Sequence, residues 1–188
     1  MKKLTILASG SGTNAENIIR FFENHKEIEI VEVLSNKKNA KVLERASRLG
    51  IANNSFDRHS FLNTDTLLNH LKATTDFLIL AGFLWKVPEN VIRAFPNRIL
   101  NIHPALLPKY GGKGMYGMHV HNAVIENEEK ESGISIHFVN ENYDEGAIVF
   151  QKSVAISSQD TPEDVAKKIH VLEYEYFPKV IEKVVLNS

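Results

Sequence analysis

The stretch Leu4-Thr5-Ile6-Leu7-Ala8-Ser9-Gly10-Ser11-Gly12-Thr13-Asn14 decides the fold class of this chain. Its apolar run, Leu4 to Ala8, is short and ends at glycines, which predicts a buried strand. The residues that follow, Ala15 to Asn24, place isoleucines and phenylalanines on one helical stripe, which predicts a helix. A strand, a glycine-rich turn and a helix therefore open the chain.

The same alternation continues along the sequence. Further strands are predicted at Ile28–Leu34, Asp76–Ala81, Arg98–His103, Gly133–Val139 and Ala147–Val154. Further helices are predicted at Ala40–Leu49, Ser60–Leu71, Val87–Ala94, His121–Glu128 and from Thr161 toward Val185, the last with a bend at Pro178. The run at 77–80 is apolar throughout, as in strands that helices cover on both faces. We expect an α/β fold with a doubly wound, mostly parallel, Rossmann-like sheet, helices on both faces and a late antiparallel section.

Composition narrows the class of protein. The 188 residues suit one domain, and we expect a single domain over residues 1–188. The formal net charge is −1, which argues against a nucleic-acid coat or a polybasic membrane binder. The chain has no cysteine, which excludes thiol catalysis and cysteine-ligated metals. No secretory or membrane segment is recognisable, so we expect a cytoplasmic location.

Several polar or glycine residues fall at the ends of predicted strands. Gly10, Gly82, His103 and Asp144 all have this position. In open α/β sheets, ligands bind outside the carboxyl ends of the strands. These four distant segments are therefore expected to surround one crevice.

The first of these segments, Ser9 to Asn14, favours a phosphate site. Glycines let the backbone approach a ligand closely, and free N–H groups at a helix start attract anions. Ala15 stands where a dinucleotide fingerprint has its third glycine, and no Gly-Lys-Ser/Thr follows. A plain turn capped by Asn or Thr is the alternative.

The richest chemistry lies in Asn101-Ile102-His103-Pro104. The two-residue period of a strand puts Asn101 and His103 on one face. An amide donor beside an imidazole suits a reaction that develops an oxyanion and moves a proton. Asp144, in an acidic loop at 140–146, would favour a protonated imidazole if it met His103. A structural His and a solvated loop are the alternatives.

Two other groups of residues have weaker functional readings. His119, His121 and His137 raise the question of a metal site, but their spacing matches no metal motif, and we expect no metal. Phe83 and Trp85 either belong to the core or stack a flat heterocycle.

Five segments together resemble the phosphoribosylglycinamide formyltransferase family, the folate-dependent enzymes of purine biosynthesis. They are Ser9–Asn14, Ala81–Phe83, Asn101–Tyr110, Gly133–Val139 and Asp144–Gly146, and they occur in that order within about residues 3–184. The Asn-x-His-Pro segment with a distant Asp is specific to folate formyltransferases as a group. The first loop indicates the glycinamide ribonucleotide branch.

The resemblance implies the roles of individual residues. The implied catalytic residues are Asn101, His103 and Asp144. The implied ribonucleotide-binding residues are Gly12, Thr13, Asn14 and Glu173. The implied folate-binding residues are Arg58, Leu84, Trp85, Lys86, Val87, Asn101, Asn140, Glu141, Asn142, Tyr143 and Asp144.

The resemblance also implies the reaction. The amine of glycinamide ribonucleotide would attack the formyl carbon of 10-formyltetrahydrofolate, the co-substrate. Asn101 would donate to the oxyanion, and His103, protonated and paired with Asp144, would stabilise it and support proton delivery to the folate nitrogen. The expected partners are these two small molecules, with no nucleic acid or membrane, in a monomer or homodimer. One departure is the glycine-rich segment Gly111 to Gly117, which is either a mobile lid or an ordered turn.

Other functions share some of these sequence features. Formyltetrahydrofolate hydrolase and methionyl-tRNA formyltransferase share Asn-x-His-Pro but usually carry a further domain, for which 188 residues leave no expected room. A dehydrogenase that binds NAD needs an acidic residue at the end of the second strand, whereas Glu32 lies inside it. A non-catalytic nucleotide-binding module would need no cluster of Asn101, His103 and Asp144.

Overall fold

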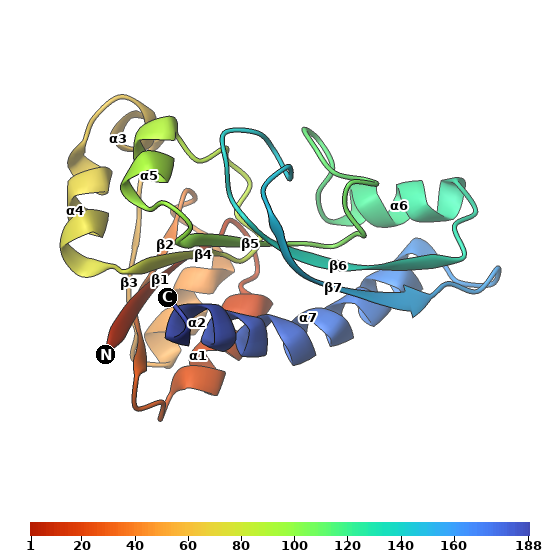
Figure 1. Ribbon diagram of the computed structural model, residues 1–188, viewed down its shortest axis with the longest axis horizontal. Helices are drawn as coiled ribbons and strands as arrows, with labels where there is room; N and C mark the ends of the chain where they lie inside the picture. The colour runs from red at the N-terminus through yellow and green to blue at the C-terminus, as the bar shows by residue number, and fades with distance from the viewer. The chain divides into compact units, whose positions relative to one another are not determined.

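In this computed structural model, which describes residues 1–188, strand β1 (Lys2–Leu7) lies in the middle of a parallel sheet (Figure 1). It pairs with β2 (Ile28–Ser35) on one side and with β4 (Phe77–Leu80) on the other. The edge strand β3 (Ala52–Ser55) pairs with β2, again in parallel. All four residues of β4 are buried, as its unbroken apolar run predicts.

The chain divides into two compact units, each described here by itself. The first comprises residues 1–100 and 181–188, and the second comprises residues 101–180. Strand order is β3-β2-β1-β4-β5 through the first unit and β5-β6-β7 through the second, with β5 (Ile99–His103) contributing residues to both. The expectation of a single domain over residues 1–188 stays a prediction.

Helices cover both faces of the sheet in the first unit. They are α1 (Thr13–Phe22), α2 (Lys41–Arg48), α3 (Arg58–Leu62), α4 (Thr66–Thr74) and α5 (Glu89–Ala94). Figure 1 shows α1 and α2 on one face and α4 and α5 on the other. Parallel strands with helices on both faces confirm the doubly wound α/β class.

The second unit contains the antiparallel section that the sequence predicts. Strands β6 (Glu131–Phe138) and β7 (Ile148–Ala155) pair antiparallel, with a register shift between Ile136 and His137. The helices are α6 (Met118–Glu126) and α7 (Pro162–Leu186), whose last residues belong to the first unit. Pro178 lies inside α7, which continues to Leu186, and a bend there stays a prediction.

Two details differ from the expected elements. The predicted helix Ser60–Leu71 is two helices, α3 and α4, separated by residues 63–65. Asp57 caps α3 by accepting a hydrogen bond from the Ser60 N–H at 2.7 Å. Strand β3 was not predicted, because Ala52-Asn53-Asn54-Ser55 has no apolar run.

None of the helices has the length and apolar character needed to cross a membrane.

Candidate active site

The loop of residues 9–14 joins β1 to α1 and contacts two other segments of the first unit. Gly12 has φ +78°, and a Cβ there would lie 2.7 Å from the Val42 backbone, so only glycine lets α2 approach this closely. The Ser9 hydroxyl accepts a hydrogen bond from the Leu84 N–H at 2.9 Å. The N-cap of α1 is Gly12, which has no side chain that could cap the helix, and a plain turn capped by Asn or Thr stays an alternative.

An aromatic group accompanies the segment 84–87 in the first unit. The rings of Phe56, Phe61 and Phe83 contact one another, with centroids 5.1–6.0 Å apart. Phe56 and Phe61 also contact Trp85, with centroids 6.0–6.1 Å apart. The Arg58 guanidinium lies 5.9 Å from the centroid of the half-buried Trp85 ring. Arg58 and Trp85, two of the expected folate residues, are therefore neighbours, and a cation over an aromatic ring stabilises both.

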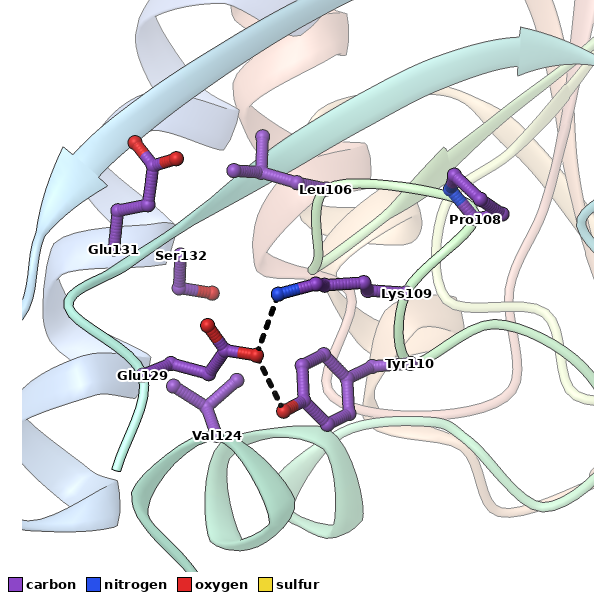
Figure 2. Close-up of a pocket in the computed structure, with 8 residues that line it drawn as sticks. All are labelled: Leu106, Pro108, Lys109, Tyr110, Val124, Glu129, Glu131 and Ser132. Atoms are coloured by element: carbon purple, nitrogen blue, oxygen red, sulfur yellow. Dashed lines mark hydrogen bonds and ion pairs between the residues drawn. The ribbon is translucent and has the colours of Figure 1, made fainter. Parts of the chain in front are cut away.

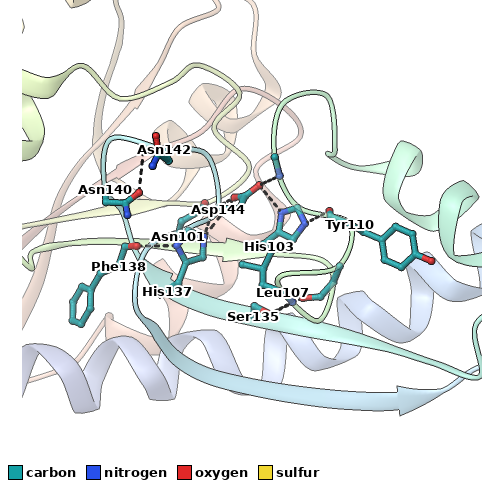
Figure 3. A network of polar contacts seen from close by, with 12 residues as sticks. Asn101, His103, Leu107, Tyr110, Ser135, His137, Phe138, Asn140, Asn142 and Asp144 are labelled. Atoms are coloured by element: carbon teal, nitrogen blue, oxygen red, sulfur yellow. Dashed lines mark hydrogen bonds and ion pairs between the residues drawn. The ribbon is translucent and has the colours of Figure 1, made fainter.

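In the second unit, Asn101, His103 and Asp144 come together (Figure 3). The Asn101 Nδ2 lies 3.5 Å from Asp144 Oδ1, and His103 Nδ1 lies 3.5 Å from Asp144 Oδ2. Asn101 and His103 thus share one face of β5, as the two-residue period predicts.

Both ring nitrogens of His103 have protein neighbours. Its Nε2 donates to the Tyr110 carbonyl at 2.7 Å, while Nδ1 faces Asp144. The side chain is buried, and this burial lowers the pKa of His103 more than Asp144 and the Tyr110 carbonyl raise it. The neutral ring is therefore favoured near pH 7 in the protein without substrates, and a protonated His103 during the reaction stays a prediction.

Asp144 is the centre of the cluster. It has φ +55° and accepts a hydrogen bond from the Gly112 N–H at 3.0 Å. Burial raises the pKa of Asp144, but its contacts with His137 and His103 and the Gly112 N–H together hold it below its usual value. Asp144 is therefore a carboxylate at neutral pH.

His137 is a member of the cluster that sequence reasoning considered only as a metal ligand. Its Nδ1 donates to the Phe138 carbonyl at 2.8 Å, so in the neutral ring Nε2 accepts from Asn101 Nδ2 at 3.0 Å. His137 also lies 3.5 Å from Asp144 Oδ1. Its place near the end of a predicted strand, like that of His103, was the signal available in the sequence.

The acidic loop is held by its own polar groups. The Asn140 side chain accepts from the Asn142 N–H at 3.0 Å, and the Asn142 amide donates to Glu145 at 2.9 Å. A Cβ on Gly146 would lie 1.7 Å from the Phe138 carbonyl oxygen, so glycine is required where the loop returns past the end of β6 toward β7. Tyr143 is exposed in this loop.

Glu173 of α7 also belongs to the second unit. It is 6% exposed, and it lies 3.2 Å from the Nδ1 of His170. The contact with Glu173 raises the pKa of His170. The negative charge of Glu173 also favours protonation of His103 and His121, although burial lowers the pKa of both.

The expected residues are thus divided between the two units. The loop with Gly12, Thr13 and Asn14, together with Arg58 and residues 84–87, lies in the first. The cluster of Asn101, His103 and Asp144, the acidic loop and Glu173 lie in the second. Glu32 lies inside β2, where its carboxylate binds the side chains of His70, Thr5 and Thr74 at 2.9–3.3 Å, so it is not placed to bind a ribose at the strand end.

The side chains of the whole chain also include possible ligands of a metal ion. No three His, Asp or Glu side chains gather in a group that could hold a metal ion.

This chain is similar in sequence to a known protein family and to individual relatives. The formyl transferase family model matches residues 2–181. Phosphoribosylglycinamide formyltransferase of Bacillus subtilis is 32% identical and aligns over 100% of this chain and 97% of its own length. The chloroplastic phosphoribosylglycinamide formyltransferase of Arabidopsis thaliana is 40% identical over 96% of this chain, which spans 64% of that relative.

Solved structures agree with the sequence relatives. Glycinamide ribonucleotide transformylase 1 from Symbiobacterium toebii is 34% identical with a TM-score of 0.86, over 96% of this chain and 86% of that one. Phosphoribosylglycinamide formyltransferase from Bacillus halodurans is 33% identical with a TM-score of 0.86, over 97% and 95% of the two chains. With nearly its whole length matched in sequence and in fold, this chain belongs to the formyl transferase family.

Proposed function

We propose that this protein transfers the formyl group of 10-formyltetrahydrofolate to the amine of glycinamide ribonucleotide. The products are formylglycinamide ribonucleotide and tetrahydrofolate, in purine biosynthesis. The observation that carries the proposal is the contact of Asn101, His103 and Asp144 around one carboxylate. The names of relatives that align over most of their length support it.

In this proposal Asn101 stabilises the oxyanion. The amine attacks the formyl carbon, and negative charge develops on the formyl oxygen. One Asn101 amide hydrogen is held by His137 at 3.0 Å, whereas the contact with Asp144 is long at 3.5 Å. The second hydrogen is thus weakly bound and available to the oxyanion. A donor aimed at developing charge is among the strongest contributions to catalysis.

In this proposal His103 and Asp144 stabilise the charge of the oxyanion and take part in proton transfer to the folate nitrogen. The resting His103 is neutral because it is buried, but a nearby oxyanion would favour its protonation, as Asp144 already does. The proton leaves the attacking amine and reaches the folate nitrogen as the formyl carbon–nitrogen bond breaks. His103 would supply or relay this proton once its Nε2 leaves the Tyr110 carbonyl.

The remaining expected residues would bind the two substrates. Gly12, Thr13 and Asn14 would hold the ribonucleotide phosphate at the start of α1, supported by the positive φ and tight packing of Gly12. Glu173 would meet the glycinamide group, supported by its burial. Arg58 and the 84–87 and 140–144 segments would hold the folate. A metal-free mechanism, a cytoplasmic location and a monomer or homodimer are further predictions of this proposal.

The deciding experiment mixes the protein with both substrates and follows deformylated folate. We expect turnover only when glycinamide ribonucleotide is present. Deformylation at the same rate without the acceptor would identify a formyltetrahydrofolate hydrolase instead. Binding without any turnover would identify a non-catalytic nucleotide-binding module.

A further inference from the structure

A pocket of about 270 Å³ lies in the second unit, lined by none of the catalytic cluster residues (Figure 2). Its lining residues are Leu106, Pro108, Lys109, Tyr110, Val124, Glu129, Glu131 and Ser132. The volume is just below the usual range of small-molecule sites, so the pocket suits a ligand smaller than a nucleotide or a folate.

Ser132 gives the first indication of a ligand. It is 3% exposed on β6, and its hydroxyl has no hydrogen-bond partner. Its neighbour Ser135, also buried, binds the Ala105 carbonyl, the Leu107 N–H and the Gln151 amide at 2.6–2.9 Å. Buried hydroxyls without partners are rare and costly. Figure 2 shows the Ser132 oxygen pointing into the space beside Lys109 and Glu129.

Glu129 gives the second indication. Lys109 Nζ at 2.8 Å and the Tyr110 hydroxyl at 2.9 Å both donate to its Oε1. These hydrogen bonds from Lys109 and Tyr110 lower the pKa of Glu129, so it is a carboxylate at neutral pH. Its second oxygen, Oε2, receives neither bond and can accept one from a ligand.

The charge of the lining selects the class of ligand. Lys109 is the positive group, and Glu129 already neutralises it, while Glu131 adds a second negative charge. An anion would therefore be repelled, whereas an ammonium group would find a carboxylate oxygen and a hydroxyl. The apolar wall of Leu106, Pro108 and Val124 would cover a hydrocarbon body.

We propose that this pocket is a second ligand site that takes a small organic amine. Its ammonium group contacts Glu129 Oε2 and Ser132 Oγ, and its apolar body packs against Leu106, Pro108 and Val124. The site goes beyond formyl transfer, because none of the residues assigned above to either substrate lines it.

Tyr110 connects this pocket with the catalytic cluster. Its hydroxyl donates to Glu129 in the pocket, and its carbonyl accepts the His103 Nε2 proton at 2.7 Å. A bound amine would attract the Glu129 carboxylate and, with it, the Tyr110 ring that is hydrogen-bonded to Glu129. Movement of the ring would in turn shift the Tyr110 carbonyl, which accepts the hydrogen bond from His103 Nε2. Occupation of the pocket therefore changes the proton affinity of His103.

The binding test uses benzylamine, with benzoate as a probe of similar shape and opposite charge. We expect calorimetry to show one saturable benzylamine site and no benzoate binding. Ser132→Ala and Glu129→Gln should each weaken benzylamine at least tenfold. The controls Ser153→Ala, at an exposed position of the adjacent strand β7, and Glu126→Gln, at an exposed position of α6, should bind as the parent does.

The proposal is overturned if benzylamine does not saturate, or if both pocket variants bind it as the parent does. Ser132→Ala keeps the test valid should Glu129→Gln fail to fold, because it removes only an oxygen without a partner. Binding is measured without folate, so the result is independent of the formyl transfer assay.

The connection to His103 is tested by nuclear magnetic resonance of its ring during a pH titration. Saturating benzylamine should shift the titration midpoint of the parent and leave it unshifted in Tyr110→Phe, which keeps the carbonyl but loses the hydroxyl. An equal midpoint with and without benzylamine in the parent would refute the connection.

Discussion

The carbonyl oxygen of Tyr110 lies 2.7 Å from His103 Nε2 and accepts its proton. Two residues later, the Gly112 N–H donates to Asp144 at 3.0 Å. The main chain of residues 110–112 therefore holds both members of the His–Asp contact. The glycine-rich segment that begins at Gly111 therefore contacts the cluster through the Gly112 N–H.

Gly111→Ala is expected to disturb this arrangement. The new Cβ would lie 2.6 Å from a Leu107 methyl and 3.3 Å from the Asp144 Cβ, so both must shift by tenths of an ångström. Because small misplacements of catalytic groups are costly, we expect turnover to fall roughly tenfold. Steady-state assays check this against Lys113→Ala, an exposed neighbour that should keep full turnover. Equal turnover in the two variants would contradict the result.

Removal of the proposed oxyanion donor should be severe. Asn101→Ala is expected to lower turnover by roughly 100- to 1,000-fold, because an oxyanion donor typically contributes that much. His103→Ala should lose at least as much. Circular dichroism should show both variants folded. Near-parental turnover in either one would remove that residue from the mechanism.

Asp144→Asn should change the pH dependence as well as the rate. The Asp144 carboxylate raises the pKa of His103 against the larger effect of burial. Without that charge the pKa of His103 falls further, so its limb of the pH–rate profile should move toward lower pH. The exposed Glu126→Gln, which also removes one negative charge, should leave the profile in place. A profile unmoved by Asp144→Asn would count against its role.

Buried histidines should make the protein sensitive to acid. Burial lowers the folded-state pKa of His103 and His121 below 6.5, so below that pH the unfolded chain binds more protons. Their contribution to stability is complete well above pH 6.5 and is lost as the pH falls toward their folded-state pKa values. His121→Gln should therefore lose less in melting temperature between pH 7.5 and 5.5 than the parent.

Calorimetric scans at several pH values measure how steeply the melting temperature falls as the pH is lowered. The control variant is His59→Gln, which removes a histidine from an exposed position. If His121→Gln and the parent showed equal slopes, burial of His121 would not be a source of acid sensitivity.

The start of α7 offers a test of stability alone. Thr161 and Asp164 cap each other: the Asp164 N–H donates to Thr161 Oγ1 at 3.2 Å, and the Thr161 N–H donates to the Asp164 carboxylate at 3.2 Å. The Thr161 hydroxyl, which donates to the Asp164 carboxylate at 2.8 Å, the Thr161 N–H and the Lys167 ammonium together lower the pKa of Asp164 to about 2. Thr161→Ala should cost about 1 kcal/mol in urea unfolding, whereas Thr161→Ser should cost little. Equal losses would argue against the cap.

The fold could be predicted where apolar patterns are strong. Residues 77–80 are apolar at every position, and β4 is buried on both faces. Strand β3 could not be predicted, because its polar residues form an edge that is specified by pairing with β2 rather than by burial. The division of residues 60–71 depends on the break at 63–65, where local hydrogen bonds compete with the helix.

The catalytic cluster was predictable in part. Period two places Asn101 and His103 together, and the resemblance adds Asp144. His137 enters the cluster from the end of β6 by accepting a hydrogen bond from Asn101, a contact that its position in the strand allows but does not by itself specify. The Tyr110 carbonyl and Gly112 N–H are main-chain groups, so no side-chain pattern could indicate them. The neutral state of His103 follows from burial, which only the structure supplies.

Trp85 is the only tryptophan in the chain, and it lies in the first unit beside Arg58. Its fluorescence is therefore a natural optical reporter of that unit. Circular dichroism, in contrast, reads the helices and strands of both units. Melting curves that coincide by the two signals would mean one cooperative unit over residues 1–188, and separate curves would mean that the two units unfold independently.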